Sequence, residues 1–169
     1  GKSRLLLVLR EHIARTAHSW LECRASPLTR NSAYQPFAEL LERALGLRPD
    51  DAAERKLERL EQSFNAAGFD ASETVPLLAP LLTLSLPARW PASHLGPELK
   101  RKRTLETLAR WLLARAHGQP LVIAFEDLHW ADASSLDLLG VLLDQLAGEP
   151  VLLVMTARPE FDPPWAERP

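Results

Sequence analysis

The sequence predicts an α/β domain built around a parallel sheet. Two continuous apolar runs, LVIAF at 121–125 and VLLVM at 151–155, have the length and character of strands that are buried on both faces. A helical segment separates the two runs, and a longer helical stretch precedes the first. Because parallel strands need crossover connections, this alternation of helices and strands favours a sheet whose strands all run in one direction.

The elements before the first apolar run are predicted from helical spacing and from chain breakers. Apolar residues follow helical spacing over residues 4–17, and the short stretch 20–23 is typical of a strand. Further helices are expected at 33–45, 52–66, 74–84 and 97–117, separated by glycines and prolines. Residues 33–118 would therefore form a helical insert between the first two strands of a single, partial domain that spans residues 1–169.

The second half of the chain carries signals for where its helices begin and end. Gly118 stands where the C-terminal cap of the helix at 97–117 belongs. After the strand at 121–127, Ser134 and Asp137 have the spacing of a capping box, which predicts a helix from Ser134 to about residue 147.

Composition and charge exclude several classes of protein. At 169 residues and 46% apolar content the chain can bury one core, and its net charge of −2 gives no general attraction to nucleic acid or anionic membranes. The basic run at 100–103 points in all directions on a helix, so a solvated helix start is favoured over a nucleic-acid site.

The single Cys23 has no partner for a disulfide or zinc site and is expected to be an inert buried thiol. With no signal peptide or membrane-spanning segment in the sequence, we expect a cytoplasmic protein that does not contact membranes.

Two adjacent carboxylates, Glu126 and Asp127, follow the first apolar run directly. Ligands of open parallel sheets bind at the carboxyl ends of the strands, and carboxylate oxygens are suitable ligands for Mg²⁺. The segment LVIAFED therefore has the form of a Walker B strand. An acidic pair at the end of a strand is also common as a solvated turn, so the interpretation depends on the segments that accompany it.

Gly1, Lys2 and Ser3 stand immediately before the first predicted helix. GK[ST] at the start of a helix is the second half of the phosphate-binding P-loop GxxxxGK[ST], in which the lysine contacts phosphates and the hydroxyl contacts Mg²⁺. The strand and the first five residues of that motif would precede Gly1, so we expect the first strand of the sheet to be missing from this chain.

The second apolar run ends in TARPE, which would place Thr156 and Arg158 at the same edge of the sheet as the acidic pair. Phosphoryl transfer needs groups that position the phosphates and neutralise their charge. Lys2 on the phosphates, Ser3 and Asp127 on Mg²⁺, and Arg158 near the γ-phosphate would fill these roles. The alternatives are that Thr156 caps the strand and that Arg158 is an ordinary surface arginine.

Four segments together resemble a known family: GKSRLL, LECRASPLTRNSAYQPFAELLER, FEDLHWADASSLDLL and LVMTARPEF. They are similar to the AAA-type ATPase domain of the STAND class of P-loop NTPases. The likeness is greatest to bacterial forms attached to adenylate or guanylate cyclase domains, or to LuxR-type regulators. It covers nearly the whole chain, and EDLHWAD is its most specific part.

The resemblance implies a P-loop NTPase fold with ATP or ADP and Mg²⁺ as cofactors, and it implies a role for each residue of the site. These roles are phosphate binding by Gly1 and Lys2, magnesium binding by Ser3, catalytic Walker B roles for Glu126 and Asp127, and γ-phosphate sensing by Arg158. The first Walker B acid is glutamate where aspartate is often found, which leaves open which carboxylate binds the metal; we favour Asp127. His129 and Trp130 are expected to pack beneath the site rather than act in it.

The function that the resemblance implies is that of a bacterial switch domain. It would bind ATP and hydrolyse it slowly within a signal-transduction or transcriptional regulatory protein. Fused partners, namely a cyclase or DNA-binding effector and helical repeats, would lie outside this chain, and nucleotide could drive self-association. Two alternatives remain open at this point: a scaffold gated by nucleotide without hydrolysis, and an AAA-like DNA-associated regulator in which this segment itself does not contact nucleic acid.

Overall fold

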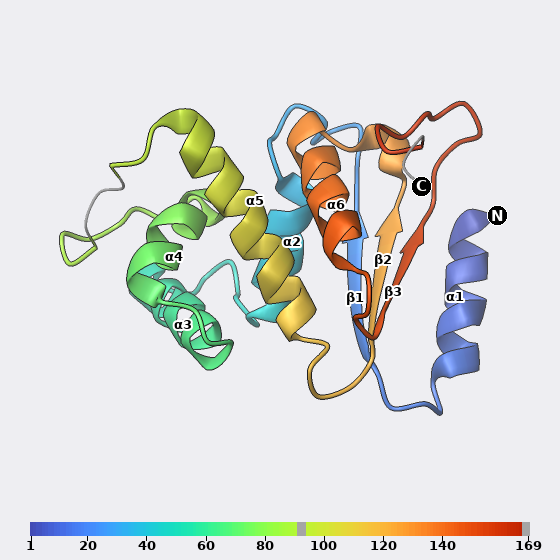
Figure 1. Ribbon diagram of the computed structural model, residues 1–169, viewed down its shortest axis with the longest axis horizontal. Helices are drawn as coiled ribbons and strands as arrows, with labels where there is room; N and C mark the ends of the chain where they lie inside the picture. The colour runs from blue at the N-terminus through green and yellow to red at the C-terminus, as the bar shows by residue number, and fades with distance from the viewer. Residues whose placement is uncertain (91–93, 167–169) are drawn as a thin grey trace.

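The computed structural model describes residues 1–90 and 94–166, and its centre is a three-stranded parallel sheet (Figure 1). The strands β1 (Ser19–Arg24), β2 (Leu121–Glu126) and β3 (Val151–Met155) lie side by side in the order β1-β2-β3. Both neighbouring pairs are parallel. The predicted α/β fold with a parallel sheet is thereby confirmed.

One face of the sheet packs against a layer of helices that includes α2 (Gln35–Ala44), α5 (Pro97–Ala114) and α6 (Ala133–Gln145) (Figure 1). Every second residue of each strand belongs to the resulting core, including Cys23, Ile123 and Phe125, which are fully buried. Burial raises the pKa of the Cys23 thiol, which keeps it protonated and unreactive.

Among the described elements, only α1 (Lys2–Ile13) covers the other face of the sheet, and it stands apart from the other helices (Figure 1). Leu6 is the buried contact of this helix, whereas Leu5 is 72% exposed. A groove of about 370 Å³ runs between α1 and the outer edge of β3. The helix was predicted to continue to residue 17, but it ends at Ile13 because the chain must turn back to enter β1.

In the described part of the connection from β1 to β2 there are four α-helices: α2, α3 (Ala53–Ala66), α4 (Ala71–Leu78) and α5. The single helix predicted at 74–84 is wrong in detail, because α4 begins earlier and gives way to the 3₁₀ helix η1 (Ala79–Leu82). The helix begins earlier than predicted because the Asp70 carboxylate caps it, accepting a hydrogen bond of 2.8 Å from the N–H of Ser72. Pro80 ends the regular helix because it has no N–H and its ring crowds the carbonyl four residues earlier. None of the described helices is long and apolar enough to cross a membrane.

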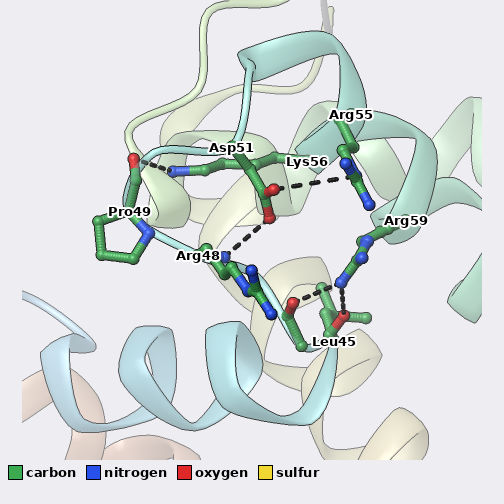
Figure 2. A network of polar contacts seen from close by, with 8 residues as sticks. Leu45, Arg48, Pro49, Asp51, Arg55, Lys56 and Arg59 are labelled. Carbon is green, nitrogen blue, oxygen red and sulfur yellow. Dashed lines mark hydrogen bonds and ion pairs between the residues drawn. The ribbon is translucent and has the colours of Figure 1, made fainter.

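The corner between α2 and α3 is fixed by polar contacts (Figure 2). Gly46 ends α2 in the left-handed conformation, with φ of 62°, and Arg59 of α3 donates hydrogen bonds to the carbonyls of Leu45, at 3.2 Å, and Gly46. The N–H of Arg48 donates to the carboxylate of Asp51 at 2.8 Å, which lowers the pKa of that carboxyl group. These contacts fix the position of α3 relative to the end of α2.

Candidate functional site

The carboxyl end of β2 meets the first turn of α1. The Ser3 hydroxyl donates a hydrogen bond of 2.7 Å to Oε2 of Glu126, the last residue of β2, whose side chain is almost fully buried. A cavity of about 190 Å³ lies beside this contact, between α1 and the sheet. A buried carboxylate needs a partner of this kind, and the structure supplies it from a residue 123 positions away in the chain.

Asp127 leaves the strand and turns the chain away from it. Its φ of 59° places it in the left-handed region, which residues other than glycine adopt infrequently, so the strand ends one residue before its predicted end at 127. Its N–H donates to the Thr156 hydroxyl at 3.1 Å, while the N–H of Thr156 donates to the Phe125 carbonyl at 2.9 Å. Thr156 therefore stabilises the strained turn that carries the second carboxylate. Strain of this kind, which costs about 1–3 kcal/mol, is concentrated at functional sites.

Arg24 is a residue of this edge that the sequence did not single out. It closes β1 in register with Glu126, and its Nη2 donates to Oδ2 of Asp127 at 3.3 Å. A basic residue at the end of the first strand could have indicated this role for Arg24. That indication can be used only when β1 is known to lie beside β2. The two carboxylates thus differ in their partners: Glu126 has a hydroxyl and Asp127 has a guanidinium.

Arg158 lies against an aromatic ring at the same edge. Its guanidinium carbon is 5.4 Å from the ring centre of Trp130, which belongs to the 3₁₀ turn η2 (Leu128–Trp130). The ring of His129 lies 5.1 Å from that of Trp130. Burial lowers the pKa of His129, and the positive charges of Arg158 and Lys2 lower it further while the charge of Asp127 opposes them. Lys2, Asp127 and Arg158 therefore all lie within electrostatic range of His129.

The remaining predicted residues stand at the start of α1. Gly1 is the N-cap of the helix and has no side chain to satisfy the first amides, although its own carbonyl accepts a hydrogen bond of 3.1 Å from the N–H of Arg4. Free amides at a helix N-terminus favour an anion, and Lys2 adds a positive charge there. Among the described residues, Lys2 and Arg158 form no ion pair with the acidic pair.

A magnesium ion fits the oxygen donors at this edge. Mg²⁺ commonly takes one or two carboxylates together with substrate phosphates and keeps several waters. The Ser3 hydroxyl and the Glu126 carboxylate are already adjacent, and they would leave most positions for water and phosphate. The part of the chain that the structure describes holds no group of three or more His, Cys, Asp or Glu side chains arranged for a metal, so a site enclosed by protein ligands is absent from it.

Asp132, the last residue of EDLHWAD, holds the loops around the site together. It is 7% exposed and caps α6, accepting hydrogen bonds from the Ser135 N–H at 3.0 Å and the Ser135 hydroxyl at 2.6 Å. It also accepts one from the N–H of Tyr34, at 3.1 Å, in the loop after β1. The capping box predicted at Ser134 is therefore wrong, because Asp132 takes the cap and starts the helix earlier.

Comparison with known proteins gives a family and a relative of this chain. A family model described as "AAA ATPase domain" matches residues 1–154. An uncharacterized protein of Rhizobium meliloti (strain 1021) is 40% identical over 75 residues, which are 44% of this chain and 7% of that protein. The match thus spans a small part of the length of the relative. No solved structure matches the chain.

Proposed function

The chain belongs to the AAA ATPase domain family, and from this premise we propose that it binds ATP with Mg²⁺ and hydrolyses it slowly to ADP. The observation that carries the proposal is the Ser3–Glu126 hydrogen bond of 2.7 Å. It brings the GKS segment and the acidic pair to one edge of the sheet. The proposed phosphate site and the proposed metal-binding carboxylate are therefore adjacent, as phosphoryl transfer requires.

Each residue of the edge then has a role in handling the nucleotide. Lys2 and the free amides at the start of α1 bind the phosphates, with Gly1 allowing the backbone to approach them. Arg158 contacts the γ-phosphate. Bound Mg²⁺ would supply charge neutralisation on the phosphate oxygens.

The contacts of the two carboxylates favour Glu126, rather than Asp127, as the acid on the metal side. In P-loop proteins the Walker A hydroxyl and the metal-binding carboxylate contact the same metal ion. Here the Ser3 hydroxyl is hydrogen-bonded to the Glu126 carboxylate. Asp127 faces the cation of Arg24 at 3.3 Å, which disfavours a divalent ion at the same oxygens. We therefore assign Asp127 to orienting the attacking water once Arg24 has released it.

The ATPase would serve as a switch in a bacterial signal-transduction or transcriptional regulatory protein, as the STAND-like segments imply. A fused cyclase or DNA-binding effector would deliver the output, and self-association could depend on the nucleotide. The Arg24–Asp127 pair favours one alternative to slow hydrolysis, a scaffold that binds nucleotide without turnover, since the water-orienting carboxylate is engaged. Mg²⁺-ATP binding without phosphate release would support the scaffold.

Replacing Lys2 by alanine in the complete protein tests nucleotide binding. A hydrogen bond to a charged group contributes about 1.5–3 kcal/mol, so Mg²⁺-ATP should bind about 10–100-fold more weakly. Isothermal titration calorimetry measures the change. Lys56→Ala, which removes a lysine of α3 whose ammonium donates a hydrogen bond to the Pro49 carbonyl, is the control and should bind as the wild type does. A wild-type protein that binds neither ATP nor ADP would overturn the proposal.

Replacing Arg158 by alanine tests the sensing of the γ-phosphate. The contact exists only when the third phosphate is present, so ATP affinity should fall about 10-fold while ADP affinity stays nearly unchanged. The ratio of the two dissociation constants is the measurement. Arg103→Ala, an exposed arginine of α5, is the matched control. An unchanged ratio in Arg158→Ala would make Arg158 a surface residue without a role in the switch.

A further inference from the structure

Trp130 and Arg158 form a pair at the carboxyl edge of the sheet, and we propose that Trp130 is a positioning residue that holds the Arg158 guanidinium ready for the γ-phosphate. The inference rests on the proposed function, because it needs Arg158 to contact ATP. On this inference Trp130 has a function in addition to packing.

The backbone fixes both partners of this pair. The N–H of Trp130 donates to the Asp127 carbonyl at 2.8 Å, which closes the 3₁₀ turn that carries the ring. Arg158 lies three residues beyond the end of β3, and the N–H of Leu128 donates to the Thr156 carbonyl at 2.9 Å, which ties the two loops together. The ends of two adjacent strands thus bring the backbones of both residues to one edge, where the guanidinium carbon lies 5.4 Å from the ring centre.

The ring is anchored, whereas the arginine is free to respond. Trp130 is partly buried and packs against the core, while Arg158 is exposed. An exposed arginine without a partner samples many rotamers, and ordering it upon ligand binding costs entropy. A ring that holds the guanidinium close to its working position reduces this cost.

Stacking is well suited to a residue that must bind a phosphate later. A guanidinium attracted to the face of a ring keeps its N–H groups directed outward, whereas an ion pair with a carboxylate would occupy them. Among the described residues, Arg158 forms no ion pair, so its N–H groups are not occupied by a carboxylate.

The test replaces Trp130 in the complete protein and measures affinities for Mg²⁺-ATP and Mg²⁺-ADP by titration calorimetry. Trp130→Leu removes the π face, and the preference for ATP over ADP should fall about two- to fivefold, as expected for an exposed cation–π pair. Trp130→Phe keeps an aromatic face and should retain most of the preference. Trp130→Met also lacks a π face but fills the space flexibly, and it serves as the test if the leucine variant does not fold.

Two further variants make the result specific. In an Arg158→Ala background, Trp130→Leu should cause no further loss, because the ring acts through the arginine. Trp20→Leu removes an equivalent pair, in which Arg10 lies 5.4 Å from the ring of Trp20, and it should leave the preference unchanged.

The outcomes separate the inference from the proposed function. If Arg158→Ala lowers the preference for ATP and neither Trp130→Leu nor Trp130→Met does, the proposed function stands and the role of Trp130 is refuted. Equal losses of ATP and ADP affinity in these variants would also refute it, since they indicate a general effect on folding. If Arg158→Ala itself changes nothing, the sensing role fails and the inference fails with it.

Discussion

Replacing Glu126 by glutamine is expected to abolish the magnesium dependence of ATP binding and to reduce turnover at least about 100-fold. A loss of this size lies at the upper end of the range seen when groups around a bound metal are changed. The substitution keeps the shape of the side chain and can still accept the hydrogen bond from Ser3, so the fold should persist. What it removes is a negative charge next to the metal. Titration of ATP affinity against Mg²⁺ concentration, together with phosphate release, measures both effects.

Asp127→Asn is the informative comparison for that experiment. On the proposed assignment it should leave magnesium-dependent ATP binding largely intact while lowering turnover about 10²–10⁴-fold, the usual range for a group that handles a proton or a water. The opposite pattern, in which Asp127→Asn loses the magnesium dependence and Glu126→Gln keeps it, would restore Asp127 as the metal ligand. Glu149→Gln, just before β3 at the opposite end of the strand, controls for the loss of one negative charge.

Replacing Asp132 by alanine should lower the free energy of unfolding by about 2–4 kcal/mol. The loss combines a helix cap, worth about 1 kcal/mol, with about 1–3 kcal/mol for leaving buried donors without acceptors. The donors are the N–H and hydroxyl of Ser135 and the N–H of Tyr34. Urea denaturation followed by tryptophan fluorescence gives the change.

Two variants show whether the loss comes from those contacts. Asp132→Asn keeps an oxygen that can accept from the two amides and should cost clearly less than alanine. Ser134→Ala alters the residue that the sequence marked as the cap and should change stability by less than about 0.5 kcal/mol, as expected for a site without such contacts. A larger loss for Ser134→Ala than for Asp132→Ala would return the cap to Ser134.

Local patterns in the sequence were enough to propose the residues of the site and to place them on their strands and helix. The apolar run at 121–125 requires burial, and a carboxylate at its end is in place to bind a ligand whichever helices cover the strand. GKS at the start of a helix is equally local, because backbone amides and one lysine suffice to attract phosphate. The family match agrees with this reading of the motifs over residues 1–154.

Contacts between residues that lie far apart in the sequence could not be predicted from such local patterns. The cap of α6 shifted from Ser134 to Asp132 because a loop almost 100 residues away presents the amide of Tyr34 to the same carboxylate. The helix expected at 74–84 is a different case, because local features explain its bounds: the Asp70 cap starts it earlier and Pro80 ends its regular part. At α6 two caps lay close together in the sequence, and the bond from Tyr34 adds a tertiary contact to the one at Asp132.

The sequence by itself determined the α/β fold and the strand that carries the acidic pair, and it supplied residue types suited to a nucleotide phosphate and a metal. Only the tertiary structure decided which partner each of these residues has: Ser3 for Glu126, Arg24 for Asp127, and Trp130 for Arg158. The physical reason is that strand formation and phosphate attraction depend on nearby residues, whereas a hydrogen bond or a stacked cation depends on distances of a few ångströms. Those distances are fixed when β1, β2 and β3 align their carboxyl ends and α1 brings its first turn to the same edge.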